Sequence, residues 1–521
     1  MRMPMFRRVC LIVLFPIFMC WSVLAPGAEM LPDIEGRYDV SGTNPDGSSY
    51  RGRVDITLQG DIFLFHWRIA NGDTYDGRGT LAGDTLTVEW GDPHPVIYKI
   101  EASGILRGTW AGGRGSETLV PKSARADMGK CSSDKEFEQI IRGCTLVIEL
   151  SERKRDRAAA YNIRGAAYVK KGDFGRAIAD YTSAIDLDRK NSDAYFNRGL
   201  LSLNDLDVEQ AIADFSKVIA LKPKDAQAYN YRGEAYSLAI DLIGDLDDFD
   251  RALADFDKAI ALDPRYARAY KNRGDLHYDE DAPDLAIMDY NKAIELKPGD
   301  ADAHFARADA LYVLQDFDAA LADLDKVLEL NATYRNAHLS RGAVLYDIGD
   351  LEDAIADLNK AIALDPKSAR AYLTRAACYQ DDGDLDRALA DFEKAIALDA
   401  NYAKAYVGRG SIKYEKGDLA GALADYDKAI ALDAKFASAY YNRGLVHYDS
   451  RRFDPALADF ETAISLNDGL AKAYVGRALV FKERGDRARA RTDLEKALAI
   501  SPGLAVAKNH LAELDKAKAA Q

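Results

Sequence analysis

The stretch Ala405-Tyr406-Val407-Gly408-Arg409-Gly410 decides the fold, because close variants of it return down the chain at a fixed interval. Its aromatic position is occupied in turn by Tyr161, Tyr195, Tyr229, Tyr270, His304, His338, Tyr372, Tyr406, Tyr440 and Tyr474. The interval is the same at every step, as from Tyr161 to Tyr195, except that the step from Tyr229 to Tyr270 is longer. A fixed period of about 34 residues indicates stacked repeats, in which each unit buries its apolar face against its neighbours.

Each repeat contains two apolar runs of helical spacing with a polar break between them. In residues 195–224 the two runs lie on either side of residues 204–207, and Pro223 follows the second run. Several other repeats carry Gly-Asp in the break, as at Gly417-Asp418. Glycine tolerates the left-handed conformation that ends a helix, and Asp can accept hydrogen bonds from the N–H groups that begin the next one. Each repeat is therefore predicted to be a helix hairpin.

This pattern resembles the tetratricopeptide repeat (TPR) family. In one repeat the residues that carry the resemblance are Tyr406, Gly410, Gly417, Ala422, Tyr426, Ala429 and Leu432. The resemblance implies an α-solenoid of about ten antiparallel hairpins over residues 156–502, coiled into a right-handed superhelix with a concave inner groove. We expect a helical half-repeat to cap it over residues 131–155 and a capping helix to follow over residues 503–521.

Arginine stands in every repeat where that family usually carries Leu, three residues after the first aromatic, and the second helix of every repeat carries an Asp. The ten predicted pairs are Arg164 with Asp180, Arg198 with Asp214, Arg232 with Asp255, Arg273 with Asp289, Arg307 with Asp323, Arg341 with Asp357, Arg375 with Asp391, Arg409 with Asp425, Arg443 with Asp459 and Arg477 with Asp493. At the ends, Leu511 replaces the Arg and Gly143 replaces the Asp, which predicts pairing within one repeat rather than between repeats. The Arg row could bind phosphates or carboxylates, or it could brace the two helices. We favour the brace, because an Asp already neutralises each Arg.

The one longer interval, from Tyr229 to Tyr270, has two interpretations. Its seven extra residues are close to two helical turns, so they can lengthen the first helix of that repeat without rotating its face. Alternatively, the extra residues between Tyr236 and Ala252 enlarge the loop between the two helices.

Residues 1–28 have the pattern of a secretory signal peptide, in which three arginines precede an apolar run that ends in small residues. An uncleaved anchor is the alternative. In both cases we expect the rest of the chain to face an exported compartment, as a periplasmic or secreted bacterial protein. Oxidising surroundings would permit a disulfide between Cys131 and Cys144. Cys378 stands where other repeats carry apolar residues and is predicted to be a buried thiol.

Residues 29–122 are rich in Gly, Thr, Asp and aromatic residues and form a separate small domain, followed by a predicted linker over residues 123–130. Short alternating runs between turn signals predict strands over residues 36–41, 51–58, 62–69, 75–81, 85–90, 96–101, 105–110 and 116–120. Eight such strands indicate an antiparallel meander that closes into a small barrel or sandwich. His66 and His94 lie here, but no Cys or third His completes a set of ligands, so no metal site is expected.

The resemblance implies that a partner lies in the inner groove, which the first helices line. The expected aromatic lining is Phe196, Tyr278, Phe305, Tyr312, Tyr346, Tyr414, Tyr441 and Tyr448, and the expected acidic lining is Asp279, Asp347, Asp381, Glu415 and Asp449. Such a surface favours a protein or peptide segment with apolar and basic side chains, unless these residues are ordinary packing and solvated groups. Lys271 is the only Lys in its row, which argues against the carboxylate-binding clamp of chaperone-type TPR proteins.

Charge and motifs point away from nucleic acid, membranes and catalysis. The formal net charge of −15 would repel nucleic acid and anionic lipid. No phosphate-binding loop, nucleophile elbow or zinc signature is present in the sequence, so no catalytic residue, cofactor or metal is expected. We therefore expect a non-catalytic scaffold for protein interactions. The alternative is a surface or matrix-binding protein in which the β-domain binds and the repeats serve as a spacer.

Overall fold

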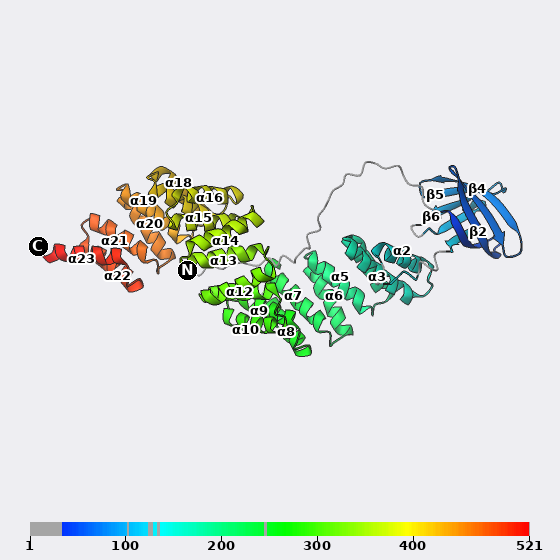
Figure 1. Cartoon of the computed structure of the whole chain (residues 1–521), viewed down its shortest axis with the longest axis horizontal. Coiled ribbons are helices and arrows are strands. Elements are labelled where there is room, and N and C mark those ends of the chain that lie inside the picture. Colours follow the sequence, from blue (N-terminus) through cyan, green and yellow to red (C-terminus); the bar gives the residue numbers. More distant parts are fainter. Residues whose placement is uncertain (1–33, 102–103, 123–128, 133–135, 244–246, 520–521) are drawn as a thin grey trace. The chain divides into compact units, whose positions relative to one another are not determined.

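Eight strands and 22 α-helices are present in the computed structural model, which describes residues 34–101, 104–122, 129–132, 136–243 and 247–519 (Figure 1). The chain comprises two compact units, Met1–Leu276 and His277–Gln521. The first contains all the strands and the helices up to most of α9 (Ala267–Asp279), and the second contains the remaining helices. The predicted signal peptide and most of the predicted linker lie outside the described residues.

The strands form one closed antiparallel barrel. They are β1 (Gly36–Thr43), β2 (Ser49–Gln59), β3 (Ile62–Ile69), β4 (Thr74–Ala82), β5 (Thr85–Glu89), β6 (Val96–Ile100), β7 (Leu106–Trp110) and β8 (Gly115–Pro121). Each strand pairs with the next one in sequence, and β1 also pairs with β8. The predicted meander is therefore confirmed, and it closes as a barrel rather than as a sandwich. The strand ends lie within two residues of the predicted ones.

Apolar side chains fill one end of the barrel. Ile56 pairs with Phe65 and Leu58 with Phe63 next to the β2–β3 turn, and Leu86 and Leu106 lie beside the other two turns at this end. All of these side chains except Leu58 are almost completely buried. The core also takes in Tyr98, for which Gly108 makes room, because a Cβ atom at position 108 would lie 2.6 Å from the tyrosine ring. Apolar side chains therefore plug one end of the barrel.

The helices alternate as first and second members of hairpins after a leading helix. They are α2 (Phe137–Leu150), α3 (Lys154–Lys171), α4 (Phe174–Leu187), α5 (Ser192–Asn204), α6 (Val208–Leu221), α7 (Ala226–Ile243), α8 (Asp247–Leu262), α9 (Ala267–Asp279), α10 (Pro283–Leu296), α11 (Ala301–Val313), α12 (Phe317–Leu330), α13 (Arg335–Ile348), α14 (Leu351–Leu364), α15 (Ala369–Asp381), α16 (Leu385–Leu398), α17 (Ala403–Glu415), α18 (Leu419–Leu432), α19 (Ala437–Asp449), α20 (Phe453–Leu466), α21 (Ala471–Glu483), α22 (Arg487–Ile500) and α23 (Ala505–Ala519). Together these helices form the predicted solenoid of helix hairpins.

The turn inside each hairpin has the predicted chemistry. Gly417 adopts a left-handed φ of 82°, and the Asp418 side chain accepts a hydrogen bond from the N–H of Gly421 at 2.9 Å. Four residues other than Gly take the same left-handed conformation in the corresponding turns, namely Leu206, Asp281, Gln315 and Arg451. The left-handed conformation therefore recurs at this turn position whether or not the residue is glycine.

The repeat with the longer interval has a longer first helix. Its α7 contains 18 residues, whereas α5 of the preceding repeat contains 13. The first of the two interpretations, a lengthened helix, is therefore confirmed. Residues 244–246 of the connection lie outside the described part.

A disulfide and a small apolar cluster occur at the start of the helical part. Cys131 is bonded to Cys144 of α2, with a Cα–Cα distance of 4.6 Å. Ile105 of the barrel and Leu146 of α2 bury each other, with Val120 and Leu150 packed beside them. These contacts attach α2 both to the segment before it and to the barrel.

Removing the disulfide is expected to destabilise the first helices. A cross-link that closes a loop of 13 residues is worth about 3 kcal/mol through the lost entropy of the unfolded chain. In the double variant Cys131→Ser/Cys144→Ser, hydrogen exchange should speed up in α2 and leave the last hairpins unchanged, since repeats interact mainly with their neighbours. Unchanged exchange in α2 would show that the disulfide contributes nothing to its stability.

Candidate functional site

Nine of the ten predicted Arg–Asp pairs lie within one unit and form as predicted, and each has the same geometry. In the hairpin of α15 and α16, Nε of Arg375 donates to Oδ2 of Asp391 at 2.7 Å and Nη2 donates to Oδ1 at 2.8 Å. The Asp side chain is 9% exposed and the Arg side chain 17%. The other pairs begin at Arg164, Arg198, Arg232, Arg307, Arg341, Arg409, Arg443 and Arg477. Arg273 and Asp289, the remaining predicted pair, lie in different units.

The predicted pairing of Arg with Asp within one repeat is confirmed, and the remaining guanidinium nitrogen donates to a side chain of the preceding repeat. Nη1 of Arg375 donates to Oδ1 of Asn359 in α14 at 2.5 Å, and Nη1 of Arg443 donates to Asp427 in α18 at 2.6 Å. Similar contacts occur at six further arginines: Arg164, Arg198, Arg232, Arg273, Arg307 and Arg341. These additional bonds were not predicted, because the prediction considered only the Asp found in every repeat and not the variable polar residue on the preceding second helix.

The aromatic residue that defines the repeat belongs to this brace. The guanidinium of Arg375 lies 5.5 Å from the centre of the Tyr372 ring, a cation–π distance that recurs in most repeats. In a repeat that carries His instead, Nδ1 of His304 hydrogen-bonds to Asp323 at 2.8 Å. The Arg row is therefore engaged by protein groups, and its geometry is that of a structural brace.

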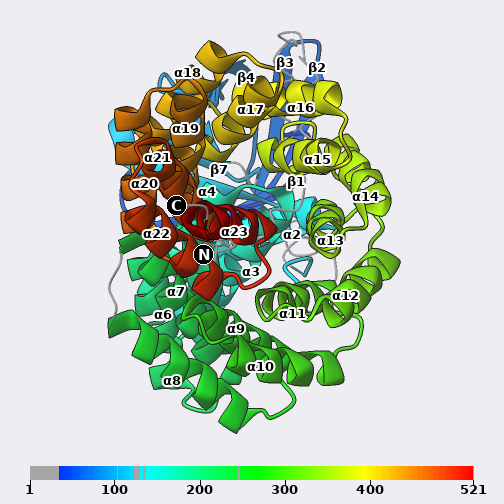
Figure 2. The same ribbon diagram turned by 90° about the vertical axis from the view of Figure 1, so that its left-hand side faces the viewer.

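The first helices of successive repeats contact one another and define what we call the inner face. In the second unit α11 contacts α13, α13 contacts α15, and the series continues to α21. Figure 2 shows α11, α13 and α15 on the inside of the curve that these hairpins follow, with α12, α14 and α16 outside them. Side chains that join successive first helices therefore lie on the inner face.

Tyrosine hydroxyls and carboxylates join successive first helices in a regular series, which we call the tyrosine–acid ladder. Tyr346 of α13 donates to Asp381 of α15 at 2.8 Å. The same hydrogen bond links Tyr312 to Asp347 and Tyr414 to Asp449, and Gln380 takes the Tyr position opposite Glu415 at 3.4 Å. Each pair spans 35 residues. The predicted aromatic and acidic rows are thus brought together as hydrogen-bonded partners.

The ladder is half-buried on the tyrosine side and exposed on the acid side. Burial, together with the hydrogen bond to a carboxylate, raises the pKa of the Tyr312, Tyr346 and Tyr414 hydroxyls above the ordinary value. These hydroxyls therefore stay protonated and remain donors at any physiological pH. Asp347, Asp381 and Asp449 are exposed, so their free lone pairs face solvent and can accept hydrogen bonds from a ligand.

Of the other predicted groove residues, the aromatic ones pack within or beside the hairpin cores. Phe305 is only 7% exposed and lies in the core between α11 and α12, and Phe196 and Tyr441 pack at the edges of equivalent cores. Tyr278 packs against α10, and the Tyr448 ring lies 5.9 Å from that of Phe453. Asp279 is exposed at the end of α9.

Two interactions of basic side chains on the first helices were not predicted from the sequence. In the first unit, Arg268 of α9 donates to Glu234 of α7 at 3.0 Å and to the Tyr231 hydroxyl at 2.9 Å. In the second unit, burial and the nearby charge of Arg370 lower the pKa of Lys404. Arg370 and Lys404 occupy equivalent positions in successive repeats, so the repeat spacing contained the signal for this pair, whereas Arg268 and Glu234 lie across the longer interval and do not occupy equivalent positions.

Within the described residues, no group of three or more His, Cys, Asp or Glu side chains is placed to hold a metal ion. His66 instead hydrogen-bonds to Asp76 at 2.6 Å. A search of the same residues finds no helix with the length and apolar character needed to span a bilayer.

The thiol of Cys378 is expected to be unreactive in the folded protein. It is completely buried in α15, and burial raises its pKa to about 12. At pH 8 it should react with a thiol reagent only after unfolding, since the thiolate is the reactive species. Stoichiometric labelling of the native protein at the rate of a free thiol would contradict this placement.

The sequence matches family models for tandem repeats. A TPR repeat model matches residues 165–204, 342–383 and 410–450, and further tetratricopeptide repeat models match residues 192–225, 238–301, 369–402, 437–470 and 471–504. Together the matches span more than half of the chain. No curated protein matches the sequence.

Solved structures of repeat proteins are also similar to parts of this chain. MamA is 30% identical over 31% of this chain and 94% of its own, with a TM-score of 0.28. YrrB, described as a TPR protein with an unusual peptide-binding site, is 26% identical over 37% of this chain and 95% of its own, with a TM-score of 0.32. The Cut9–Hcn1 hetero-tetramer of the APC/C is 15% identical over 75% of this chain and 96% of its own, with a TM-score of 0.45. Because these family models match the helix hairpins over more than half of the chain, the chain belongs to the tetratricopeptide repeat family.

Proposed function

We propose that the protein is a non-catalytic scaffold of an exported compartment that binds a partner segment with basic and apolar side chains along its inner face. The observation that carries the proposal is the tyrosine–acid ladder, which presents exposed carboxylates beside half-buried aromatic rings on successive first helices. Tyrosine rings provide large contact area, and the carboxylates favour Lys or Arg side chains of the partner. Arg370 and Lys404 favour one acidic or carbonyl group within the same segment.

The exported location rests on the predicted signal peptide and is supported by the disulfide between Cys131 and Cys144. The non-catalytic role is supported by the membership of a repeat family that commonly assembles proteins.

The acids of the ladder provide the test. We would replace Asp347, Asp381 and Asp449 together by Asn, which can still accept the tyrosine hydrogen bonds but has no charge. Fluorescence anisotropy would follow a fluorescein-labelled peptide rich in Lys and Leu. We expect the triple variant to bind it about tenfold more weakly, which corresponds to roughly 0.5 kcal/mol for each exposed charge.

The matched control variant removes three negative charges from second helices instead of first helices. Asp318, Asp386 and Asp454 lie in the first turns of the second helices α12, α16 and α20. Their replacement by Asn should change peptide affinity less than threefold if binding occurs on the inner face. Equal losses in both triple variants would refute the proposed site. Binding that neither triple variant weakens would favour the alternative, in which the barrel binds and the repeats are a spacer.

A further inference from the structure

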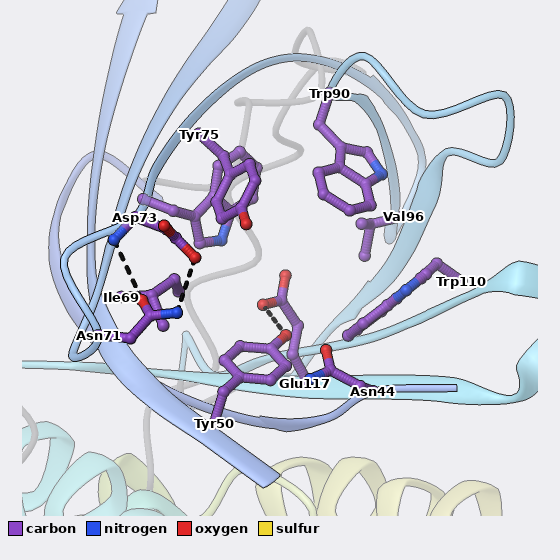
Figure 3. A pocket seen from close by; sticks show the side chains of 11 residues that line it. Asn44, Tyr50, Ile69, Asn71, Asp73, Tyr75, Trp90, Val96, Trp110 and Glu117 are labelled. Atoms are coloured by element: carbon purple, nitrogen blue, oxygen red, sulfur yellow. Dashed lines mark hydrogen bonds between the residues drawn. The ribbon is translucent and has the colours of Figure 1, made fainter. Parts of the chain in front are cut away.

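The barrel contains a cavity of about 180 Å³ at the end opposite its apolar plug. Its lining includes Tyr50, Trp67, Tyr75, Trp90, Trp110 and Glu117. These residues lie near the β1–β2, β3–β4, β5–β6 and β7–β8 turns, which all lie at one end of a meander (Figure 3). A cavity of about 150 Å³ accommodates a benzene molecule, so this one has room for a small organic ligand.

Four aromatic rings follow one another around the wall. The Tyr75 and Trp90 rings meet edge to face with centres 5.7 Å apart, and Trp90 meets Trp110 in the same way at 6.3 Å. Trp110 is followed by Tyr50 at 6.0 Å. Trp90 is fixed at the mouth because its Nε1 donates to the carbonyl of His94 at 3.1 Å. Figure 3 shows these rings around the space that the other lining residues enclose.

A buried carboxylate forms the floor of this space. Glu117 is 5% exposed and faces inward on β8, in phase with Leu119. Its Oε2 accepts a hydrogen bond from Tyr50 at 2.7 Å, and its Oε1 accepts one from Tyr98. Among the ion pairs of the described residues none involves Glu117, so no protein cation balances this carboxylate. Trp67 also lines the cavity, and its indole nitrogen is buried without a hydrogen bond of good geometry.

We propose that this cavity binds a small organic cation with an alkylated ammonium group, held between the aromatic rings and the Glu117 carboxylate. Ring faces attract such cations strongly when water is excluded, and this is how quaternary ammonium ligands are commonly recognised. A cation would also supply the counter-charge that the buried carboxylate lacks. An alkylated ammonium suits the site better than a bare one, because its methyl groups can pack against the five aromatic rings of the lining while its charge faces Glu117.

Two other ligand classes fit the lining less well. An anion would meet Glu117 and Asp73 and would gain no basic side chain from the lining. A neutral apolar ligand of the same size would fill the space but would gain no charge interaction with Glu117.

Choline and its neutral isostere 3,3-dimethylbutan-1-ol provide the test, because they differ only in the charged nitrogen. Trp67, Trp90 and Trp110, the described tryptophans, all line the cavity, so tryptophan emission of the full chain reports on binding there. We expect saturable quenching by choline at concentrations at least tenfold lower than those needed for the isostere. Equal responses to both would show an apolar cavity without charge recognition, and no saturable response to choline would also overturn the proposal.

Variants test whether choline causes the quenching by binding in this cavity. Glu117→Gln should weaken choline binding at least tenfold, whereas Glu89→Gln, which removes an exposed carboxylate on β5, should leave it unchanged. Trp90→Leu at the mouth provides a second variant that does not alter the buried hydrogen bonds, and it should weaken choline more than the isostere. Far-ultraviolet and near-ultraviolet circular dichroism would verify the fold of each variant. Undiminished choline binding in either Glu117→Gln or Trp90→Leu would refute the site.

Discussion

Raising the pH from 5 to 8 is expected to lower the free energy of unfolding of the barrel by roughly 2 to 3 kcal/mol through Glu117 alone. Burial raises the pKa of this carboxyl to about 7 in the folded protein from its ordinary value of 4.5. A group whose pKa is raised by folding stabilises the folded state below the lower value, and this stabilisation is lost as the pH rises through the higher one. The loss should therefore fall mainly between pH 5 and 7.

Denaturant titrations followed by tryptophan emission would measure this effect, because the described tryptophans all lie in the barrel. Glu117→Gln removes the titrating group and should remove this part of the pH dependence, making the variant more stable than the wild type at pH 8. Glu89→Gln should retain the pH dependence of the wild type. If Glu117→Gln and the wild type lose stability equally between pH 5 and 8, the carboxylate is not buried as described.

Replacing Arg375 alone by Leu should cost about 3 to 5 kcal/mol of local stability, because it leaves the Asp391 carboxylate buried without its partner. The double variant Arg375→Leu/Asp391→Leu should recover most of this loss, since two apolar side chains can fill the space of a buried ion pair. Hydrogen exchange of α15 and α16 is the suitable measurement, because a stack of repeats does not unfold in a single step.

The exposed pair in the same hairpin supplies the control. Arg387 bonds to Asp384 at 2.6 Å with its side chain 59% exposed. Arg387→Leu should leave exchange in α15 and α16 close to that of the wild type. Equal effects of the single and the double brace variants would show that Arg375 and Asp391 contribute independently, and the brace would be refuted.

Periodicity was sufficient to predict the hairpins, their turns and nine of the Arg–Asp pairs, because a repeat multiplies each weak local signal. The bond from the brace to the preceding repeat could not be found in the same way. Its acceptor varies among Thr, Ser, Asp and Asn, as at Thr182, Ser216, Asp427 and Asn359. A position without a constant residue type has no signature when the repeats are aligned.

The ladder and the cavity illustrate what a sequence shows only in part. Tyr346 and Asp381 were each predicted on the lining, and their constant spacing of 35 residues could have identified them as partners. Glu117 stands in phase with buried Leu119 and could have been recognised as an inward-facing carboxylate. The cavity above it could not have been predicted, because its size depends on how the side chains of all eight strands fill a closed barrel.

Photo-crosslinking from the inner face tests the central claim, that the repeats bind a partner segment there. Benzoylphenylalanine at Gln380 would probe the ladder without breaking a tyrosine hydrogen bond. The same group at exposed Lys394 of α16 would probe a second helix, and at Tyr75 it would probe the mouth of the barrel. With the labelled peptide rich in Lys and Leu, we predict adducts at position 380 and little labelling at 394 or 75. Labelling confined to position 75, or equal at 380 and 394, would contradict the account.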